Sequence, residues 1–385
     1  MVTQPMLQVS PEPPLRRSNS LHVCWVDPSA DPRWERFVSS HPDALIYHHP
    51  AWIRALEKES RRECLGLACE DSFGTLQAVL PLFRTRGFPF GLGGRLTSSR
   101  LSSLPRTPLA GPLSMNRDAT VRLLRAAMKL VDEEPGIQLQ IKSENDELEG
   151  LVDGLVCLPW RMSYVLELPD SPDKIRFGGH ENHHRVKWAV NKAQRSGLKV
   201  RITESEDDLR AWYAMYLDRM RYNLVPPRSY RFFSALWQLL KPRDLMHLMV
   251  AEHQTPEGTR LVAGSIFLLQ GRRFFYAYTG SRAIDFGFHP NDLLQWEAIH
   301  EACRRGCHLY DFGEVPEEHQ QLAQFKAKWC AEPKRLFHYC YPVTKSERQA
   351  ASIPNFWGRK TATVIWRQVP LPVTVLAGDW VYKFL

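Results

Sequence analysis

The sequence lacks the features that define several large classes of protein, beginning with paired cysteines and metal-ligand spacings. Its eight cysteines include no CxxC pair and no Cys/His spacing of a zinc site, and the helical pair Cys303 and Cys307 has no matching second pair. We therefore expect free thiols and no metal site. The first 20 residues are polar and rich in proline without an apolar core, so they do not look like a secretion signal. Reduced thiols and the missing signal favour the cytoplasm.

Motifs for nucleotide triphosphates and for covalent catalysis are also missing. The segment GLGGR (residues 91–95) lacks the GK[ST] ending of a phosphate-binding loop, which argues against a nucleotide-triphosphate site there. No Ser-His-Asp or Cys-His arrangement is legible in the sequence. Any group transfer is therefore expected to proceed by direct attack, without a covalent enzyme intermediate.

What the sequence does contain is typical of a globular protein with an anionic partner. Hydrophobic residues make up 44% and charged residues 24% of the 385 positions, so a well-formed core is expected. The length predicts two domains, and the Pro- and Ser-rich residues 1–20 predict a flexible tail. The formal charge of +8 favours nucleic acid, a phosphate-bearing cofactor or an anionic membrane surface, without choosing among them.

The hydrophobic periodicity predicts two halves, each of mixed α and β structure. Residues 21–165 contain two strands joined by a turn at 71–74, a helix at 117–134 and a strand at 137–142. Residues 166–345 begin with a basic helix and a strand, and then run in the order helix, helix, three strands, helix, strand, helix, strand. This second order is that of an acetyltransferase-type α/β domain.

Two further segments carry predictions about surfaces. The charged residues of the basic helix, Arg185, Lys187 and Lys192, form either a solvated face or an anion-steering surface for phosphates. Residues 346–385 form a tail whose apolar piece is broken by prolines and is too short to span a bilayer. Its tryptophans and basic residues fit either a membrane interface or a helix docked on the second domain.

The stretch 289–330 carries the strongest signal for a site. A helical pattern leads into a short strand that ends near Asp311, and a turn at Gly313 and an acidic loop follow. A second short helix then carries Phe325 and Lys326. This order predicts a unit that brings an Asp, a glycine turn and a Lys to neighbouring places.

The same stretch resembles a known family. The run N-x-L-x-x-W-E-A-I-x-x-A-x-x-x-G-x-x-x-Y-D-F-G, followed by Q-F-K-x-K-W, is similar to the FemAB-like branch of the GNAT acyltransferases, especially the bacterial group associated with exopolysaccharide and exosortase loci. HPDALIYHHPAWIRAL in the first half and VPLPVTVLAG near the end resemble segments of that group as well. The resemblance covers most of residues 21–385.

The resemblance implies two tandem GNAT-like domains with a cleft between them and transfer of an acyl or aminoacyl group to an amine. The acceptor would be a cell-envelope, glycan or lipid precursor, met in the cytoplasm or at the inner face of the plasma membrane. Two donors stay open, because no sustained heptads mark the coiled-coil hairpin of tRNA-dependent members and the segment DFGFHPN lacks the pyrophosphate signature of acyl-CoA-dependent ones. No tightly bound cofactor is expected.

Acyl transfer to an amine requires a positive or N–H donor for the oxyanion and a group that takes a proton. Lys326, on the Phe-Lys pair of the family, fits the first role, although it can also be a surface lysine. Asp311 or Glu314 could orient the amine or act as base, and Asp311 could equally be a turn cap. The expected substrate-binding residues are Phe325, Tyr278, Asn291, Gln295, Trp296, Glu297, Gly313, Glu314, Arg185, Lys187 and Lys192, with Trp296 also a candidate core residue.

Two other functions stay compatible with these residues. One is an acyl-CoA-dependent N-acyltransferase that acts on a sphingoid or amino-sugar amine. The other is a non-catalytic protein that uses the cleft and the basic helix to bind an anionic glycan, lipid or RNA. Replacement of Lys326 and Asp311 should separate the enzymes from the binding protein.

Overall fold

The computed structural model describes residues 20–87, 99–343 and 371–381 of the chain. Its strands are β1 (His22–Val26), β2 (Leu65–Glu70), β3 (Leu76–Thr85), β4 (Ser99–Ser102), β5 (Leu113–Ser114), β6 (Ile137–Ser143), β7 (Val156–Glu167), β8 (Leu198–Ile202), β9 (Met246–Thr255), β10 (Gly258–Gln270), β11 (Arg273–Ser281), β12 (Leu309–Val315) and β13 (Glu332–Tyr341). Its helices are α1 (Pro32–Ser40), α2 (Pro50–Ser60), α3 (Arg117–Asp132), α4 (His180–Arg195), α5 (Glu206–Tyr222), α6 (Tyr230–Leu239), α7 (Pro290–Arg304), α8 (Gln320–Ala327) and α11 (Leu371–Val381).

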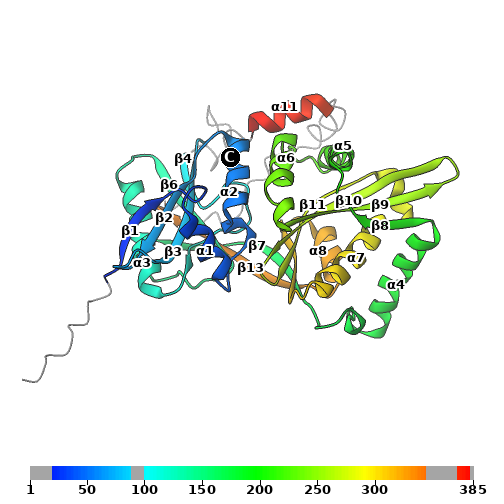
Figure 1. Ribbon diagram of the computed structural model, residues 1–385, viewed down its shortest axis with the longest axis horizontal. Coiled ribbons are helices and arrows are strands. Elements are labelled where there is room, and N and C mark those ends of the chain that lie inside the picture. The colour runs from blue at the N-terminus through cyan, green and yellow to red at the C-terminus, as the bar shows by residue number, and fades with distance from the viewer. Residues whose placement is uncertain (1–19, 88–98, 344–370, 382–385) are drawn as a thin grey trace, which may run out of the picture.

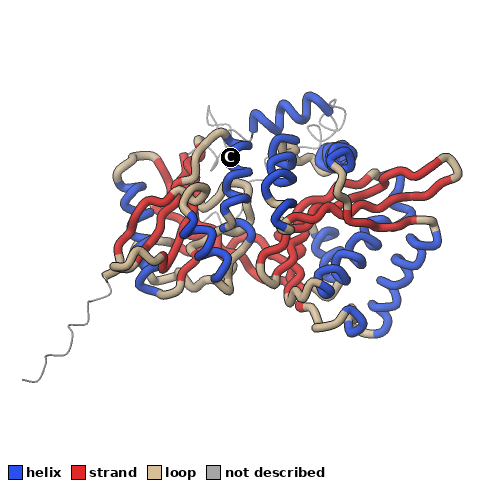
Figure 2. The backbone as a smooth tube through the Cα atoms, in the orientation of Figure 1, coloured by secondary structure: helices blue, strands red, loops and turns tan. Residues whose placement is uncertain are grey.

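One mixed sheet runs through the described chain and joins the two halves (Figures 1 and 2). The strand order is β1-β2-β3-β4-β6-β13-β7-β12-β11-β10-β9-β8, and β5 pairs with β3 beside this path. The predicted fold class, a mixed α/β protein with GNAT-like order, is confirmed. The sheet has no gap where the sequence suggested a boundary at residue 165, because that residue lies inside β7.

The strand that joins the two halves of the sheet, β13, is the last one along the described chain. β13 lies between β6 of the first half and β7, and it pairs antiparallel with both. β7 in turn pairs antiparallel with β12 of the second half. The residues just before 160 already belong to β7, because Val156–Pro159 pair with Phe337–Cys340.

Helices cover both faces of the sheet in the second half. In Figure 1, α5 and α6 lie on one side and α4, α7 and α8 on the other. The periodicity of α4 puts Val186, Ala189, Val190 and Ala193 inward, as the sequence predicted. Two helices of the first half begin at side-chain caps: Asp31 accepts from the Arg33 N–H before α1, and Asn116 accepts from the Ala119 N–H before α3.

The two halves also share a core on the face that carries α2 and α6. Trp52 of α2 is 1% exposed and meets Phe232 of α6 edge to face, with ring centroids 5.6 Å apart. Arginine, tyrosine and glutamate side chains reinforce this contact, as described below. The halves are thus fixed to each other by aromatic packing as well as by strand pairing.

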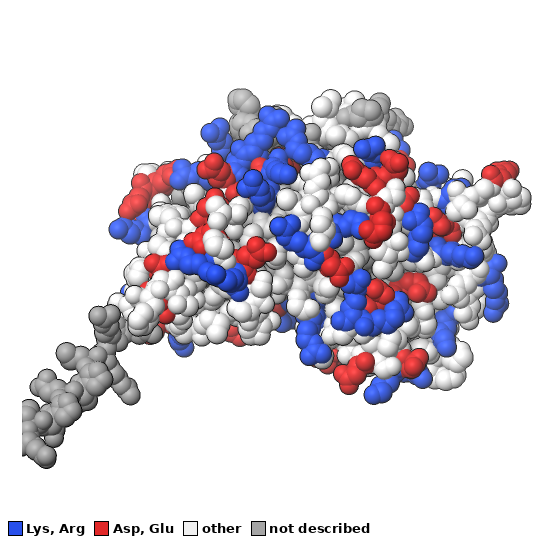
Figure 3. Space-filling view, in the orientation of Figure 1, with Lys and Arg blue, Asp and Glu red and all other residues white. Residues whose placement is uncertain are grey.

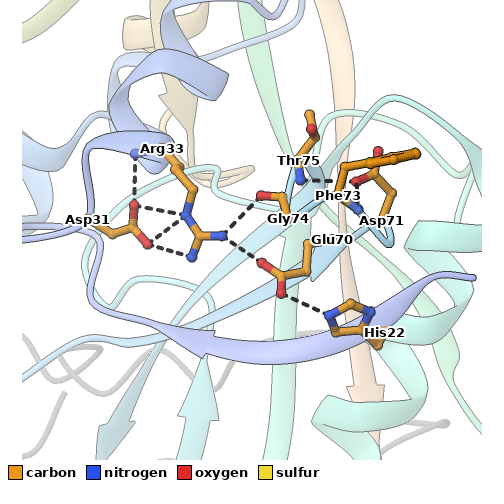
Figure 4. A network of polar contacts seen from close by, with 8 residues as sticks. All are labelled: His22, Asp31, Arg33, Glu70, Asp71, Phe73, Gly74 and Thr75. Carbon is orange, nitrogen blue, oxygen red and sulfur yellow. Dashed lines mark hydrogen bonds and ion pairs between the residues drawn. The ribbon is translucent and has the colours of Figure 1, made fainter.

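At the outer edge of the first half, a polar network ties α1 to the strands β1 and β2 (Figure 4). The Arg33 guanidinium lies 2.7 Å from Asp31 and 2.7 Å from Glu70 and donates to the Gly74 carbonyl. Glu70 also meets His22 at 2.8 Å. Asp31 and Arg33 side chains are 21% and 36% exposed, so these pairs mainly fix the helix position and add little stability.

Predictions for the ends of the chain can be followed only in part. Except for Ser20, the predicted tail at 1–20 lies outside the described residues, as do 344–370. Residues 371–381 form α11, which packs against α5 beside the Pro227 carbonyl. Among the described residues, no helix has the length and apolar character needed to cross a bilayer.

Candidate active site

The site begins where two parallel strands separate. β11 and β12 pair over three positions, ending at Phe275 and Asp311, and then diverge. Beyond this point residues 276–279 of β11 and 312–314 of β12 line a cavity of about 880 Å³. Its opposite wall comes from the first half, with Tyr47, Trp52 and Lys142 among the lining residues. The expected cleft between the halves is therefore present.

Lys326 lines this cavity and is 3% exposed. Its ammonium donates to the carbonyls of Phe312 (2.5 Å), Gly313 (2.8 Å) and Glu314 (3.2 Å), on the stretch of β12 that has left β11. Burial lowers the Lys326 pKa to about 8, while Asp311 and Glu314 act in the opposite direction. Three carbonyl acceptors match the three protons of an ammonium, so Lys326 carries its positive charge at the fork, the point where β11 and β12 separate.

Gly313 is what makes this arrangement of carbonyls possible. The residue has φ of +75° inside a β-bulge, where the register of β12 against β7 shifts between Asp311 and Glu314. The sequence suggested a turn after the strand, but β12 continues to Val315. A bulge re-aims the backbone without ending the strand. In this case it presents successive carbonyls to one lysine.

Asp311 does not reach the cavity. Its carboxylate is 4% exposed and accepts from the Arg273 guanidinium (2.6 Å), the Ser163 hydroxyl (3.2 Å) and the Gly313 N–H (2.7 Å). Arg273 pairs with Glu144 of the first half as well. A carboxylate with these partners is occupied, so the geometry matches the turn-cap alternative and gives no support to a role as base.

Glu314 is the carboxylate that faces the cavity in the described part of the chain. It accepts from Arg161 at 2.7 Å and from the Trp160 indole at 3.3 Å, and its side chain is 28% exposed. It is therefore held in place but still open on one side. An ammonium group that enters the cavity would meet this carboxylate.

Tyr278 also lines the cavity, and a chain of ion pairs from the first half holds it. Its hydroxyl accepts from Arg228 at 2.6 Å, and Arg228 pairs with Glu59 of α2 at 2.8 Å. Arg106 meets the other Glu59 oxygen at 2.9 Å. Burial raises the Tyr278 pKa, so the phenol keeps its proton at neutral pH. Since Arg228 occupies one lone pair, Tyr278 can donate its own proton elsewhere.

The cavity wall is strongly basic. Apart from Lys326, its cationic residues are Arg100, Arg106, Lys142, Arg161 and Arg219. Lys142 donates to the carbonyls of Leu104 (2.8 Å) and Thr107 (2.9 Å), and burial lowers its pKa to about 8. One carboxylate against six cations makes this an anion-attracting cavity.

The sequence did not identify most of these cations, because they lie in the first half. The signal that the sequence does offer is the arginine content of the Gly-, Pro- and Ser-rich segment 87–114. Arg100 and Arg106 of that segment do line the cavity. Residues 88–98 of it lie outside the described part of the chain.

His338 of β13 adds a neutral polar group to the same wall. Its ring stacks on Trp160 with centroids 4.0 Å apart, and it is 7% exposed. Burial next to Lys142, Arg161 and Arg100 lowers its pKa well below the usual value, so the imidazole is uncharged at pH 7. Gln140 donates to Nδ1 at 3.4 Å, which leaves the proton on Nε2, and this atom has no hydrogen-bond partner among the described residues.

The remaining predicted residues divide into two groups. Phe325 and Asn291 line the cavity, and the buried Asn291 Oδ1 has no hydrogen-bond partner among the described residues. Gln295, Trp296 and Glu297 do not: Gln295 accepts from the Tyr310 hydroxyl at 2.6 Å, and Trp296 packs against Phe177. Gln295 is buried and Trp296 packs against the core, while Glu297 is half-buried outside the cavity, and of these α7 positions only Asn291 in the first turn lines it.

The basic residues of α4 are also separate from the cavity. Arg185 donates to Asn182, and Lys192 lies 3.4 Å from His289, on the side of the sheet away from α5 and α6 (Figure 1). Lys187 is exposed on the same helix. None of the three is among the lining residues, so the structure does not bring them to the predicted cleft.

The comparisons with known proteins agree with this geometry. Residues 181–321 match a family model described as an acetyltransferase (GNAT) domain. Among solved structures, FemX is 16% identical, has a TM-score of 0.58, and the match covers 80% of this chain and 95% of FemX. A search of curated proteins found no match to the chain.

Two further solved structures are similar as well. The C-terminal domain (DUF2156) of a protein described as a putative lysylphosphatidylglycerol synthetase from Agrobacterium fabrum is 11% identical with a TM-score of 0.57, over 83% of this chain and 93% of that one. L-PGS from Bacillus licheniformis is 13% identical with a TM-score of 0.55, over 85% and 96%. At these identities the similarity concerns the fold.

The family-model match and the forked strands define the class: the chain carries a GNAT domain and is an acyltransferase. Over 80% of the chain the fold is similar to that of FemX, and one sheet joins the two halves. The family resemblance predicted from the sequence is confirmed at this level.

Proposed function

We propose that the protein is an N-acyltransferase that moves an acyl or aminoacyl group to an amine of a cell-envelope, glycan or lipid precursor. The observation that carries the proposal is the cavity at the fork of β11 and β12, which combines a basic wall with one accessible carboxylate. The basic wall suits the phosphates of either candidate donor, acyl-CoA or aminoacyl-tRNA. The acceptor would be met in the cytoplasm or at the inner membrane face.

In the proposed reaction the acceptor nitrogen attacks the carbonyl carbon of the donor directly. A C–N bond forms as the bond to the thiol sulfur or the ribose oxygen breaks, and the proton that the attacking nitrogen gives up ends on that departing sulfur or oxygen. We assign Glu314 to holding the acceptor ammonium and taking its extra proton so that the neutral amine can attack, because Glu314 is the carboxylate of the described cavity wall. Tyr278, protonated and held by Arg228, is placed to donate to the oxygen that gains charge.

Lys326 is proposed to act through its position. Its ammonium is held by three carbonyls, so it contributes a fixed positive charge at the fork and keeps β12 apart from β11. Asp311 is proposed as a positioning residue, since it holds Gly313 and Arg273 in place.

The test is transfer to amine acceptors with acyl-CoA in one arm and charged tRNA in the other, with product mass as the readout. We expect product in one arm, and Glu314→Gln should lower kcat/KM by about 100-fold or more. Glu317→Gln is the matched control, since Glu317 is 71% exposed and pairs with Arg335 outside the cavity. Binding of anionic glycan or lipid with no product in either arm would contradict the enzyme proposal.

A further inference from the structure

The C-terminal helix α11 has two apolar faces, only one of which is covered. Thr374 and Gly378, four positions apart, are buried, and a Cβ added at Gly378 would lie 2.3 Å from the Pro227 carbonyl. Val373, Leu376 and Trp380 share the opposite side of the helix and are 49%, 68% and 49% exposed. A helix that is apolar all round is usually buried all round.

The position of α11 leaves its second face at the outer edge of the molecule. In Figure 1 the helix lies across the tops of α5 and α6, away from the sheet. It has 11 residues, about half the length needed to span a bilayer. A short helix that carries aliphatic residues and a tryptophan at its end is suited to the interface between lipid and water.

Positive charge beside the helix favours an anionic binding partner. A groove of about 630 Å³ next to α11 is lined by Arg61, Arg106 and Arg231, together with Leu376 and Trp380. Arg61 and Arg231 are exposed. Figure 3 shows Lys and Arg side chains gathered along the upper edge of the molecule, with Asp and Glu side chains to their right. The Glu59 carboxylate of the groove is neutralised by Arg106 and Arg228, so the groove stays positive.

We propose that α11 and this groove dock the protein on a bilayer that contains anionic lipid. Val373, Leu376 and Trp380 enter the headgroup region, and Arg61 and Arg231 meet lipid phosphates. Arg106 lines both the groove and the catalytic cavity, so docking brings the cavity close to the lipid surface. The inference stands on the helix and the groove and does not require the proposed reaction.

The experiment is flotation of the full chain with vesicles of phosphatidylglycerol and phosphatidylcholine, compared with phosphatidylcholine alone, over a salt series. We expect binding to the anionic vesicles that weakens as salt rises. Leu376→Asp should lower the affinity at least tenfold, and Arg61→Gln with Arg231→Gln about twentyfold. The control is Phe73→Asp, because Phe73 is 75% exposed in the turn before β3 and should leave binding unchanged.

Three results would overturn the inference. The first is an absence of vesicle binding, and the second is equal loss in Leu376→Asp and Phe73→Asp. The third is a dimer of the wild type that Leu376→Asp dissociates, which would make a second copy the occupant of the face. Thermal melts of each variant verify folding. Transfer to a soluble amine should be unaffected by Leu376→Asp, so failure of docking and failure of the enzyme proposal are distinguishable.

Discussion

At the scale of single residues, the candidate site depends on buried polar groups that are matched to their partners. Lys326 and Lys142 are both buried, and each donates to backbone carbonyls. Such groups cannot be read from sequence, where a lysine is normally assigned to the surface. The Phe-Lys pair was found because it resembled a family motif, whereas nothing local marks Lys142 on β6 as a cavity residue. Its role depends on which strands become neighbours.

A single buried residue, His48, should make the stability of the protein depend on pH. His48 is 3% exposed, its Nδ1 accepts from the Leu45 N–H, and its Nε2 donates to the Gly111 carbonyl, so both ring nitrogens are satisfied in the neutral form. Burial lowers its pKa from 6.5 to about 4. The unfolded chain therefore binds this proton first, and stability falls as pH drops from about 6.5 toward 4.

Urea titrations at pH 7 and pH 5 measure this effect. The His48 proton should lower the free energy of unfolding by on the order of 2 kcal/mol between the two values. His48→Gln removes the titrating group, so the free energy of unfolding of this variant should fall less between pH 7 and pH 5 than that of the wild type. An equal loss in both proteins would show that His48 does not titrate as described.

At the scale of elements, the site forms where β11 and β12 stop pairing and separate. β11 and β12 stop pairing after three positions, and the bulge at Gly313 turns β12 toward Lys326. The sequence predicted both strands, but it predicted that the second one ends in a turn at Gly313, because glycine after a short apolar run usually ends a strand. A bulge differs from a turn only in whether a neighbouring strand continues the pairing, and that neighbour, β7, is about 150 positions away in sequence.

Gly313→Ala tests the bulge. The added methyl group has space, since its nearest neighbour would be the Tyr276 carbonyl at 3.7 Å, so the cost comes from the positive φ alone. We expect a loss of about 1–2 kcal/mol in the free energy of unfolding, together with lower transfer activity as the carbonyls around Lys326 shift. Gly287→Ala, which lies in open space without a positive φ, should cost less than about 0.5 kcal/mol. Similar losses in the two variants would argue against a strained bulge.

At the scale of the whole molecule, the halves predicted from sequence are two regions of one sheet. The order of elements was predicted well, because periodicity and turn residues are local. The position of β13 in the sheet was not predicted, because the alternating pattern of a strand does not indicate which strands it pairs with. The predicted α4 surface shows the same limit: its charges were identified, but the sequence could not place them on the face away from the cavity.

Separate expression of the first half tests this dependence. Residues 20–167 retain the helices of the first half and its strands β1 to β7, but β6 and β7 lose the strand between them, which pairs with β6 at five positions and with β7 at eight. We expect this fragment to be unfolded or aggregated by circular dichroism, and residues 168–385 added during refolding should restore native structure. A cooperative, soluble fragment of 20–167 would show that the first half is an independent domain.

The place of β13 in the sheet has a consequence for how the chain is made. A ribosome releases the first half long before residues 332–341 emerge, so β6 and β7 wait without the strand that lies between them. Two unpaired strand edges are open to wrong partners during that interval. Slow synthesis would lengthen this exposure, whereas a chaperone that covers strand edges would shorten it. The cavity, whose wall includes His338 of this same strand, can form only after residues 332–341 have emerged.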